Sequence, residues 1–386
     1  MRLSPIRTGL SQRDAENLSH PTAELRGCSC QDAVNEGSLP MSVTWEEYLS
    51  VPDAGAKFVE CFGRCRHAFE RHRENIRGLV EKTSPRVVAC LGAGVLNDIP
   101  YRALVRSGAT IHLVDWLAGS SDVGISLSLI ETDEDQRPQC IYCDVSIDCP
   151  EEFCVNYQRS RGSAGAVCDR FKLSPCEPPT CEAFLKGESP LVHYEDVTGG
   201  YASQFGHRLL RELRDARTWE RALSKATKLA GRIQPTGRLS IDDASVDLVT
   251  SSMLVSQFAH EPYDFFSART AERLGPPTPQ QEARLLPAME KLRSALFAHQ
   301  VQRHLDEVQR ILAAGGICYL SFEVFSTVPQ SHQWFMVEGV PAVLKAAGDR
   351  FHFNFDLLPE TELIVQFQAT RRRSLTLCVV MELKPI

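Results

Sequence analysis

Short apolar runs that break off into glycine or small polar residues recur along this chain, and they predict the buried strands of a parallel sheet. The first run covers residues 87–91 and leads into Gly92 and Gly94, and the second covers residues 111–114 and ends at Asp115. Similar runs follow at residues 246–254 and 317–323. Because helical stretches separate them, the pattern predicts an α/β fold with a doubly wound sheet.

Helices are predicted from apolar positions three, four or seven residues apart. Residues 54–82 keep this spacing, and residues 207–232 contain few helix breakers. A long helix is predicted to open at Pro287, a residue suited to a first helical turn, and to end at Gly315 and Gly316. Near the end of the chain, residues 362–367 and 375–381 are two apolar runs separated by about a turn, which predicts a hairpin.

The glycine turn after the first strand carries the candidate chemistry. Gly92, Ala93 and Gly94 would let a ligand approach the backbone, and an acid at the end of the second strand, here Asp115, can accept both hydroxyls of a ribose. A dinucleotide site would place a third glycine at the position of Asn97, and Asp98 would repel a pyrophosphate. A carboxylate there favours an ammonium group, as found in S-adenosylmethionine.

On these residues the segment resembles motif I and the strand-two acid of class I S-adenosylmethionine-dependent methyltransferases, a superfamily that includes azetidine-forming relatives. The resemblance implies a mostly parallel, seven-stranded, Rossmann-like sheet with an antiparallel seventh strand. It implies S-adenosylmethionine as the cofactor, with these binding residues: Gly92, Ala93, Gly94, Asp98, Asp115, Trp116, Asp196, Val197 and Ser252. The candidate catalytic residues are Tyr201, Gln257, His260 and Tyr263, and Glu261 is a further candidate base.

The third strand has two candidates. Residues 191–199 contain Asp-Val-Thr-Gly, which resembles the family's third strand and makes Asp196 the expected contact of the adenine amino group, whereas residues 141–146 offer Asp144. With the first choice, residues 117–189 are an insertion. The predicted organisation is then a disordered segment 1–40, a helical cap 41–83, and a cofactor-binding domain 84–386.

Charge and composition limit the classes of molecule that the protein is expected to bind. The formal net charge is −7, which gives no electrostatic footprint for nucleic acid. No apolar stretch reaches the ~18 residues that would span a bilayer. The N-terminus lacks the apolar core of a signal peptide, so a cytoplasmic location is expected. We therefore expect a small-molecule substrate and no nucleic-acid or membrane partner, and the oligomeric state stays open.

Cysteines cluster in the predicted insertion. The chain contains 14 cysteines, and Cys140 and Cys143 form a Cys-x2-Cys pair within that cluster. A tetrahedral metal needs two further ligands at a matching knuckle, and no second Cys-x2-Cys is present. We expect reduced thiols and no metal, with zinc as the alternative.

Three functions remain open at this point. Methylation of a small molecule is favoured. The first alternative is attack on the carbon chain of S-adenosylmethionine that releases methylthioadenosine, as in enzymes similar to nicotianamine and azetidine-carboxylate synthases, because this fold supports both reactions. The second is a non-catalytic nucleotide-binding protein.

Overall fold

The computed structural model describes most of the chain beyond the first strand. Described are residues 44–49, 69–93, 98–100, 103–104, 107–115, 130–132, 138–140, 190–235, 237–327, 333–337, 339–358, 363–367 and 373–384. The segment 1–40, most of the insertion 117–189, and the site candidates Gly94 and Trp116 lie outside these residues, as do Asn97 and Asp144.

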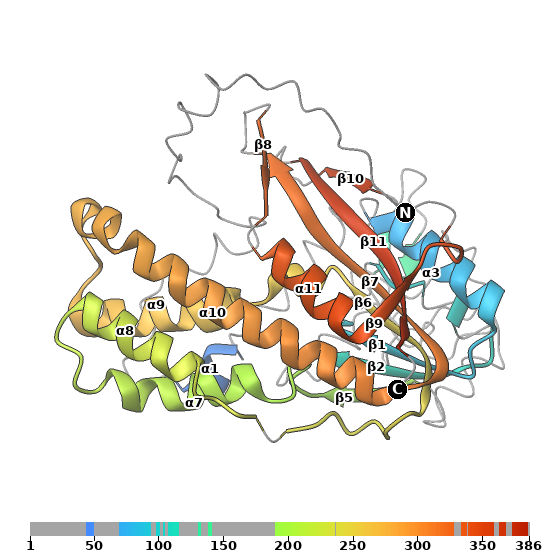
Figure 1. Ribbon diagram of the computed structural model, residues 1–386, viewed down its shortest axis with the longest axis horizontal. Helices are drawn as coiled ribbons and strands as arrows, with labels where there is room; N and C mark the ends of the chain where they lie inside the picture. Colours follow the sequence, from blue (N-terminus) through green and yellow to red (C-terminus); the bar gives the residue numbers. More distant parts are fainter. Residues whose placement is uncertain are drawn as a thin grey trace.

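A nine-stranded sheet forms the centre of the described chain (Figure 1). Its main path runs in the order β10-β11-β7-β6-β1-β2-β5, while β8 pairs with β7 and β9 pairs with β11. The bounds are β1 Val87–Leu91, β2 Thr110–Asp115, β5 Leu191–Tyr194, β6 Val246–Ser252, β7 Leu312–Thr327, β8 Trp334–Met336, β9 Phe351–Asn354, β10 Leu363–Phe367 and β11 Arg373–Leu383. The α/β prediction is confirmed, but the predicted mostly parallel sheet of seven strands is not. The prediction omitted β8 and β9, and four of the eight strand pairings in this sheet are antiparallel, because β11 and β8 both run against β7 and β11 also pairs with β9 and β10.

Strand direction identifies where the order reverses. β1 pairs in parallel with both β2 and β6, β2 pairs in parallel with β5, and β6 with β7. β11 is antiparallel to β7 and to β10, which confirms the closing hairpin. The chain thus moves outward from β1 to β2 and β5, then returns to the other side of β1. Open α/β sheets bind ligands at such a switch point, outside the carboxyl ends of the strands.

The third-strand alternatives are also resolved. β5, which precedes Asp196, lies beside β2, with Val114 opposite His193. β3 (Ile130–Thr132) and β4 (Pro138–Cys140) instead form a separate two-stranded sheet. The strand that leads to Asp196 is therefore the third strand of the parallel sheet, as the resemblance implied.

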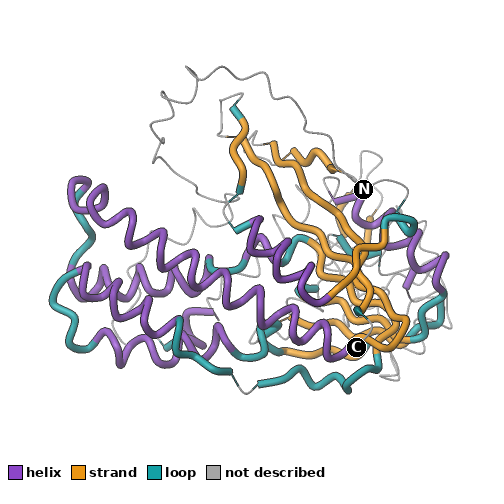
Figure 2. Tube along the Cα trace, viewed as in Figure 1, coloured by secondary structure: helices purple, strands orange, loops and turns teal. Residues whose placement is uncertain are grey.

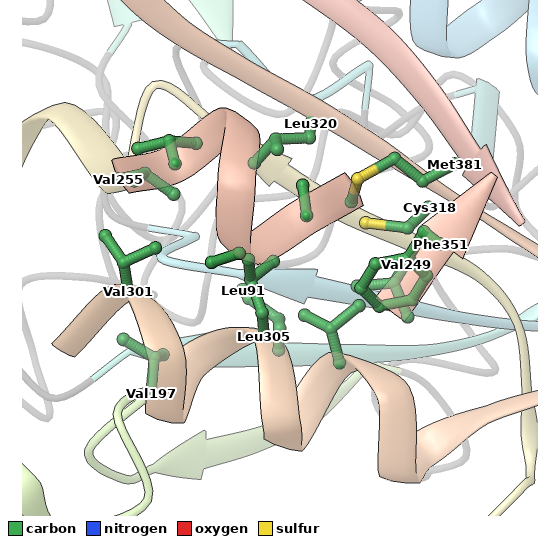
Figure 3. Close-up of a cluster of buried hydrophobic side chains, with 14 of the residues drawn as sticks. Leu91, Val197, Val249, Val255, Val301, Leu305, Cys318, Leu320, Phe351 and Met381 are labelled. Atoms are coloured by element: carbon green, nitrogen blue, oxygen red, sulfur yellow. The ribbon is translucent and has the colours of Figure 1, made fainter. Parts of the chain in front are cut away.

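Apolar side chains alternate between the two faces of the sheet and build two cores. On one face, α3 (Glu70–Thr83) packs Ile76 and Leu79 against Val88 and Ile111. On the other, α10 (Pro279–Ile311) and α11 (Val340–Arg350) cover Leu91, Val249 and Leu320, as Figure 3 shows for part of this core. Helices thus cover both faces, which confirms the doubly wound arrangement.

A third core lies between helices only. It joins α1 (Trp45–Leu49), α7 (Tyr201–Leu213), α8 (Trp219–Ala230), α9 (His260–Leu274) and part of α10. These helices gather at one end of the molecule, and most of the strands lie at the other (Figure 2). Of the predicted cap 41–83, α1 packs against α9 through the Trp45 and Phe265 rings (centroids 5.1 Å apart), whereas α3 packs on the sheet.

Three helix boundaries differ from the predictions. Residues 207–232 belong to two helices rather than one, because the chain turns between Leu213 and Trp219. α10 begins at Pro279, where Thr278 and Gln281 form a capping box, so Pro287 lies inside the helix. Gly315 and Gly316 lie within β7 and do not terminate α10, which ends at Ile311.

Gly206 provides a test of how α1 is attached. A Cβ added at Gly206 on α7 would overlap the Trp45 indole. We expect Gly206→Ala to lower the free energy of unfolding by about 1–3 kcal/mol, because overpacking displaces Trp45. In a Trp45→Ala background the same change should instead stabilise by roughly 0.5–1 kcal/mol, because alanine is the better helix former. Denaturant unfolding of the four proteins measures this coupling, and additive effects would contradict the contact.

Candidate functional site

The turn after β1 brings three strand ends together. Gly92 has φ +71°, and its N–H and that of Ala93 both donate to the Val114 carbonyl near the end of β2, at 2.8 and 3.0 Å. A Cβ on Gly92 would lie 2.6 Å from Cδ1 of Leu254, which follows β6. The turn therefore requires glycine both for its conformation and for the close approach of Leu254.

Asp98 occupies a buried position beside this turn. Its side chain is hydrogen-bonded by Ser252, and the Ser252 hydroxyl lies 3.1 Å from the Ser321 hydroxyl. Burial raises the pKa of Asp98 to about 6, although the Ser252 hydrogen bond and the nearby Arg73 act in the opposite direction. The ends of β6 and β7 thus hold a buried carboxyl group whose ionised form would gain from a cation.

A second group of acids lies at the end of β2. Burial, followed by the charges of Asp264 and Asp115, raises the pKa of Glu261 to about 7. Burial also raises the pKa of Asp264 to about 6. Tyr48 on α1 is close to both acids of α9, since burial and then the charges of Asp264 and Glu261 raise the pKa of its hydroxyl. α1 therefore lies beside the acids of α9, and Asp115 completes this group.

The connection from β6 to α9 contains unusual backbone geometry. Four non-glycine residues in the described part of the chain have positive φ, and two of them, Met253 (+51°) and Ala259 (+74°), bracket this connection. Between them lies the 3-10 helix η3, Val255–Gln257. Left-handed conformations of non-glycine residues persist only where the surroundings enforce them, and they cluster at functional sites.

The loop between β5 and α7 uses Asp196 for its own structure. Oδ1 of Asp196 accepts from the Thr198 N–H (2.8 Å) and hydroxyl, and Oδ2 accepts from the Ser203 N–H (3.0 Å) and hydroxyl (2.9 Å). Four donors fill the acceptor positions of the carboxylate. The structure therefore differs from the expected adenine contact through this side chain, and peptide groups of the loop are left for such a role.

The four candidate catalytic residues separate into two pairs. Gln257 is exposed on η3, and the partly buried His260 is the first residue of α9, next to Glu261. Tyr201 and Tyr263 instead belong to the helical core. The Tyr201 hydroxyl donates to the Ala230 carbonyl at 2.8 Å, and the Arg293 guanidinium lies 4.0 Å from the Tyr263 ring centroid. Gln257 and His260 thus lie on the connection between β6 and α9, and Tyr201 and Tyr263 lie in the helical core.

Sequence reasoning did not identify His304, Ser321 or Arg73, and it included Ser251 only as part of the segment 251–263 that follows the fourth predicted strand. Ser321 and Ser251 are ordinary residues of apolar strands, and His304 and Arg73 are single polar residues in helices remote in sequence. No local pattern marks them.

The described residues contain neither a cluster of metal ligands nor a membrane-spanning helix. Within the described ranges, no group of three or more His, Cys, Asp or Glu side chains is placed to hold a metal ion. Cys90, Cys318 and Cys378 are buried thiols, whereas Cys143 lies outside the described residues. None of the described helices is both long and apolar enough to cross a membrane.

Comparisons with known proteins give weak similarities. No protein family model matches the sequence, and no curated protein matches it significantly. The crystal structure of the PH0226 protein from Pyrococcus horikoshii OT3 is similar with a TM-score of 0.31 and 11% identity, covering 79% of this chain and 86% of that chain. Human N-acetylserotonin methyltransferase in complex with SAM gives a TM-score of 0.30 and 10% identity, covering 92% of this chain and 66% of that chain. Similarities at TM-scores of 0.31 and 0.30 assign neither a family nor a function to this chain.

The raised pKa of Glu261 predicts a pH dependence of stability. A carboxyl whose pKa moves from 4.5 to about 7 on folding contributes stability that is complete below pH 4.5 and is lost as the pH rises to 7. We expect Glu261→Gln to gain roughly 3 kcal/mol relative to the wild type between pH 4.5 and 7.5, because one pKa unit corresponds to about 1.4 kcal/mol. Denaturant unfolding across this range measures it. Glu290→Gln, an exposed residue of α10, is the control, and parallel curves for Glu261→Gln and wild type would refute the burial of the acid.

Proposed function

We propose that the protein is an S-adenosylmethionine-dependent transferase that methylates a small molecule. One observation carries the proposal: the strand order reverses at β1, and the glycine turn, Asp98, Asp115 and Ser252 all lie at the carboxyl ends of β1, β2 and β6. A ligand crevice is expected at that place in an open α/β sheet.

The adenosine part of the cofactor fits the β2 and β5 side of this crevice. Asp115 ends β2, where its carboxylate would accept the two ribose hydroxyls. Val197 is the residue after Asp196. Its N–H has no acceptor among the described residues. That N–H would donate to a ring nitrogen of adenine, which replaces the side-chain contact expected from sequence.

The charge of the site supports a cationic cofactor. Asp98 and Glu261 are buried or partly buried carboxyls near the turn, and each gains by proximity to a positive group. The ammonium and sulfonium groups of S-adenosylmethionine meet that requirement, whereas the pyrophosphate of a dinucleotide would be repelled. The carboxylates and the glycine turn therefore favour S-adenosylmethionine over NAD as the cofactor.

When bound, the cofactor supplies a methyl group already activated by a sulfonium. The protein's part is then alignment and the exclusion of water. Glu261, with a pKa of about 7, is positioned at the start of α9 to take a proton from an alcohol or ammonium acceptor near neutral pH. His260, one residue earlier, is a second candidate base.

Product analysis tests the proposal. The purified protein is incubated with S-adenosylmethionine alone and with a panel of small amines, alcohols and thiols, and the adenosine product is identified. Adenosylhomocysteine that forms only with an acceptor supports methyl transfer. Methylthioadenosine without an acceptor would instead establish attack on the carbon chain. Tight binding without either product would establish a non-catalytic binding protein.

Asp115→Ala tests the cofactor site directly. We expect the affinity for S-adenosylmethionine to fall at least about 100-fold, because two charge-assisted hydrogen bonds are lost, each contributing roughly 1.5–3 kcal/mol. Calorimetric titration measures the affinity. Asp215→Ala, which removes an acid with 76% of its side chain exposed, is the matched control. Unchanged affinity in a folded Asp115→Ala protein would exclude the ribose role.

A further inference from the structure

A buried histidine on α10 connects two strand ends at the candidate site. His304 Nδ1 lies 3.0 Å from the Val197 carbonyl oxygen in the β5–α7 loop, and its Nε2 lies 2.9 Å from the Ser251 hydroxyl near the end of β6. His304 and Ser251 are both fully buried. Figure 3 shows Val197 beside the α10 residues Val301 and Leu305, which flank His304 along the helix.

The partners determine the tautomer of His304. A carbonyl oxygen only accepts hydrogen bonds, so Nδ1 carries the proton and donates to Val197. Nε2 is then an acceptor, and the Ser251 hydroxyl donates to it. Burial lowers the pKa of His304 to about 4, so the ring is neutral near pH 7. The hydrogen bonds therefore run in one direction, from Ser251 through His304 to Val197.

The peptide group between Val197 and Thr198 is held at both ends as a result. His304 binds its carbonyl, and Oδ1 of Asp196 accepts from its N–H at 2.8 Å. The next residues leave little room for movement, because a Cβ on Gly199 would lie 3.1 Å from the Gly237 carbonyl. The preceding peptide, which carries the Val197 N–H, is held as well, because its Asp196 carbonyl accepts from the Gly199 N–H at 2.9 Å.

We infer that His304 is a positioning residue, which orients the β5–α7 loop for the adenine end of the cofactor by donating from Nδ1 to the Val197 carbonyl. The inference rests on the proposed function. The Ser251 hydroxyl donates to Nε2, the nitrogen that the bond to the Val197 carbonyl leaves as an acceptor.

Two amide substitutions separate this role from packing. The side-chain amide of His304→Asn can replace Nδ1–H, whereas that of His304→Gln reaches the position of Nε2 and leaves Val197 without a donor. Both variants lose ring volume, and both should melt at a lower temperature. We expect His304→Asn to bind S-adenosylmethionine within about threefold of the wild type and His304→Gln to bind at least about tenfold more weakly. Calorimetry below the melting temperature of both variants measures this difference.

Controls locate the effect at the adenine end. Methylthioadenosine shares the adenosine part and lacks the amino-acid part, so its affinity should fall by the same factor in His304→Gln. Ser251→Ala keeps the bond from His304 to Val197 and should bind within about threefold of the wild type. Equal affinities of the Asn and Gln variants, or a loss confined to S-adenosylmethionine, would overturn the inference.

A measurement on the wild type tests the inference even if both variants fail to fold. Nitrogen NMR of protein labelled at histidine should show His304 protonated at Nδ1 and unprotonated at Nε2, and the opposite tautomer would overturn the inference. If the wild type binds neither S-adenosylmethionine nor methylthioadenosine, the proposed function fails and this inference with it. If the wild type binds both and the Gln variant binds equally well, only the positioning role fails.

Discussion

The hydrogen-bonded ion pair between Glu307 and Arg310 on α10 fixes the backbone that frames the candidate site. The Arg310 guanidinium donates to the Leu239 and Ile241 carbonyls at 3.0 and 2.8 Å and contacts Glu307 at 2.7 Å, while Glu307 accepts from the Leu239 N–H at 2.9 Å. Only 12% and 10% of these two side chains are exposed. Because removal of Arg310 would leave the buried Glu307 carboxylate without its cation, the segment before β6 has one favourable arrangement.

That segment in turn holds the edge of the parallel sheet. The Ser240 N–H donates to Glu195 at 2.8 Å, and the Ser240 hydroxyl lies 2.8 Å from His193, whose other ring nitrogen lies 2.8 Å from His112 on β2. β5 is only four residues long, so the strand itself provides few ladder bonds. Polar contacts from α10 through the loop thus position the end of β5, and with it the loop that carries Asp196 and Val197.

The parts of the structure that depend on local pattern could be predicted from sequence. β1, β2, β6 and the closing hairpin follow from apolar runs and the residues that end them. Helix boundaries were less accessible, since Pro287 and Pro279 are both compatible with a first turn and only the Thr278 capping box distinguishes them. Gly315 has φ +79° as a helix cap would require, yet it lies in a strand whose pairing with β6 shifts register there. The pairing of β7 with β6, and not a helix end, accounts for the conformation of Gly315.

The candidate site also combines residues that local pattern predicts with contacts that only the tertiary structure brings together. Gly92, Asp98 and Asp115 could be proposed from sequence because each lies within a few residues of a predicted strand end, and Asp196 could be proposed from the Asp-Val-Thr-Gly segment. The four hydrogen bonds that Asp196 accepts could not be predicted, since the donors are residues that only the turn into α7 brings together. His304 is more than a hundred residues from Val197, so no spacing rule connects them.

Buried acids and left-handed backbone conformations occur together at the strand ends. Asp98 and Glu261 have raised pKa values, so each opposes folding when ionised, and Met253 and Ala259 adopt left-handed conformations that cost of order 1 kcal/mol or more each. The three apolar cores have no need of such features, and the carboxyl ends of β1, β2 and β6 concentrate them. A cationic ligand would favour the ionised carboxylates and recover part of this cost. The stability that the sheet and α10 provide therefore permits an arrangement at these strand ends that is unfavourable while no positive group lies near the ionised carboxylates.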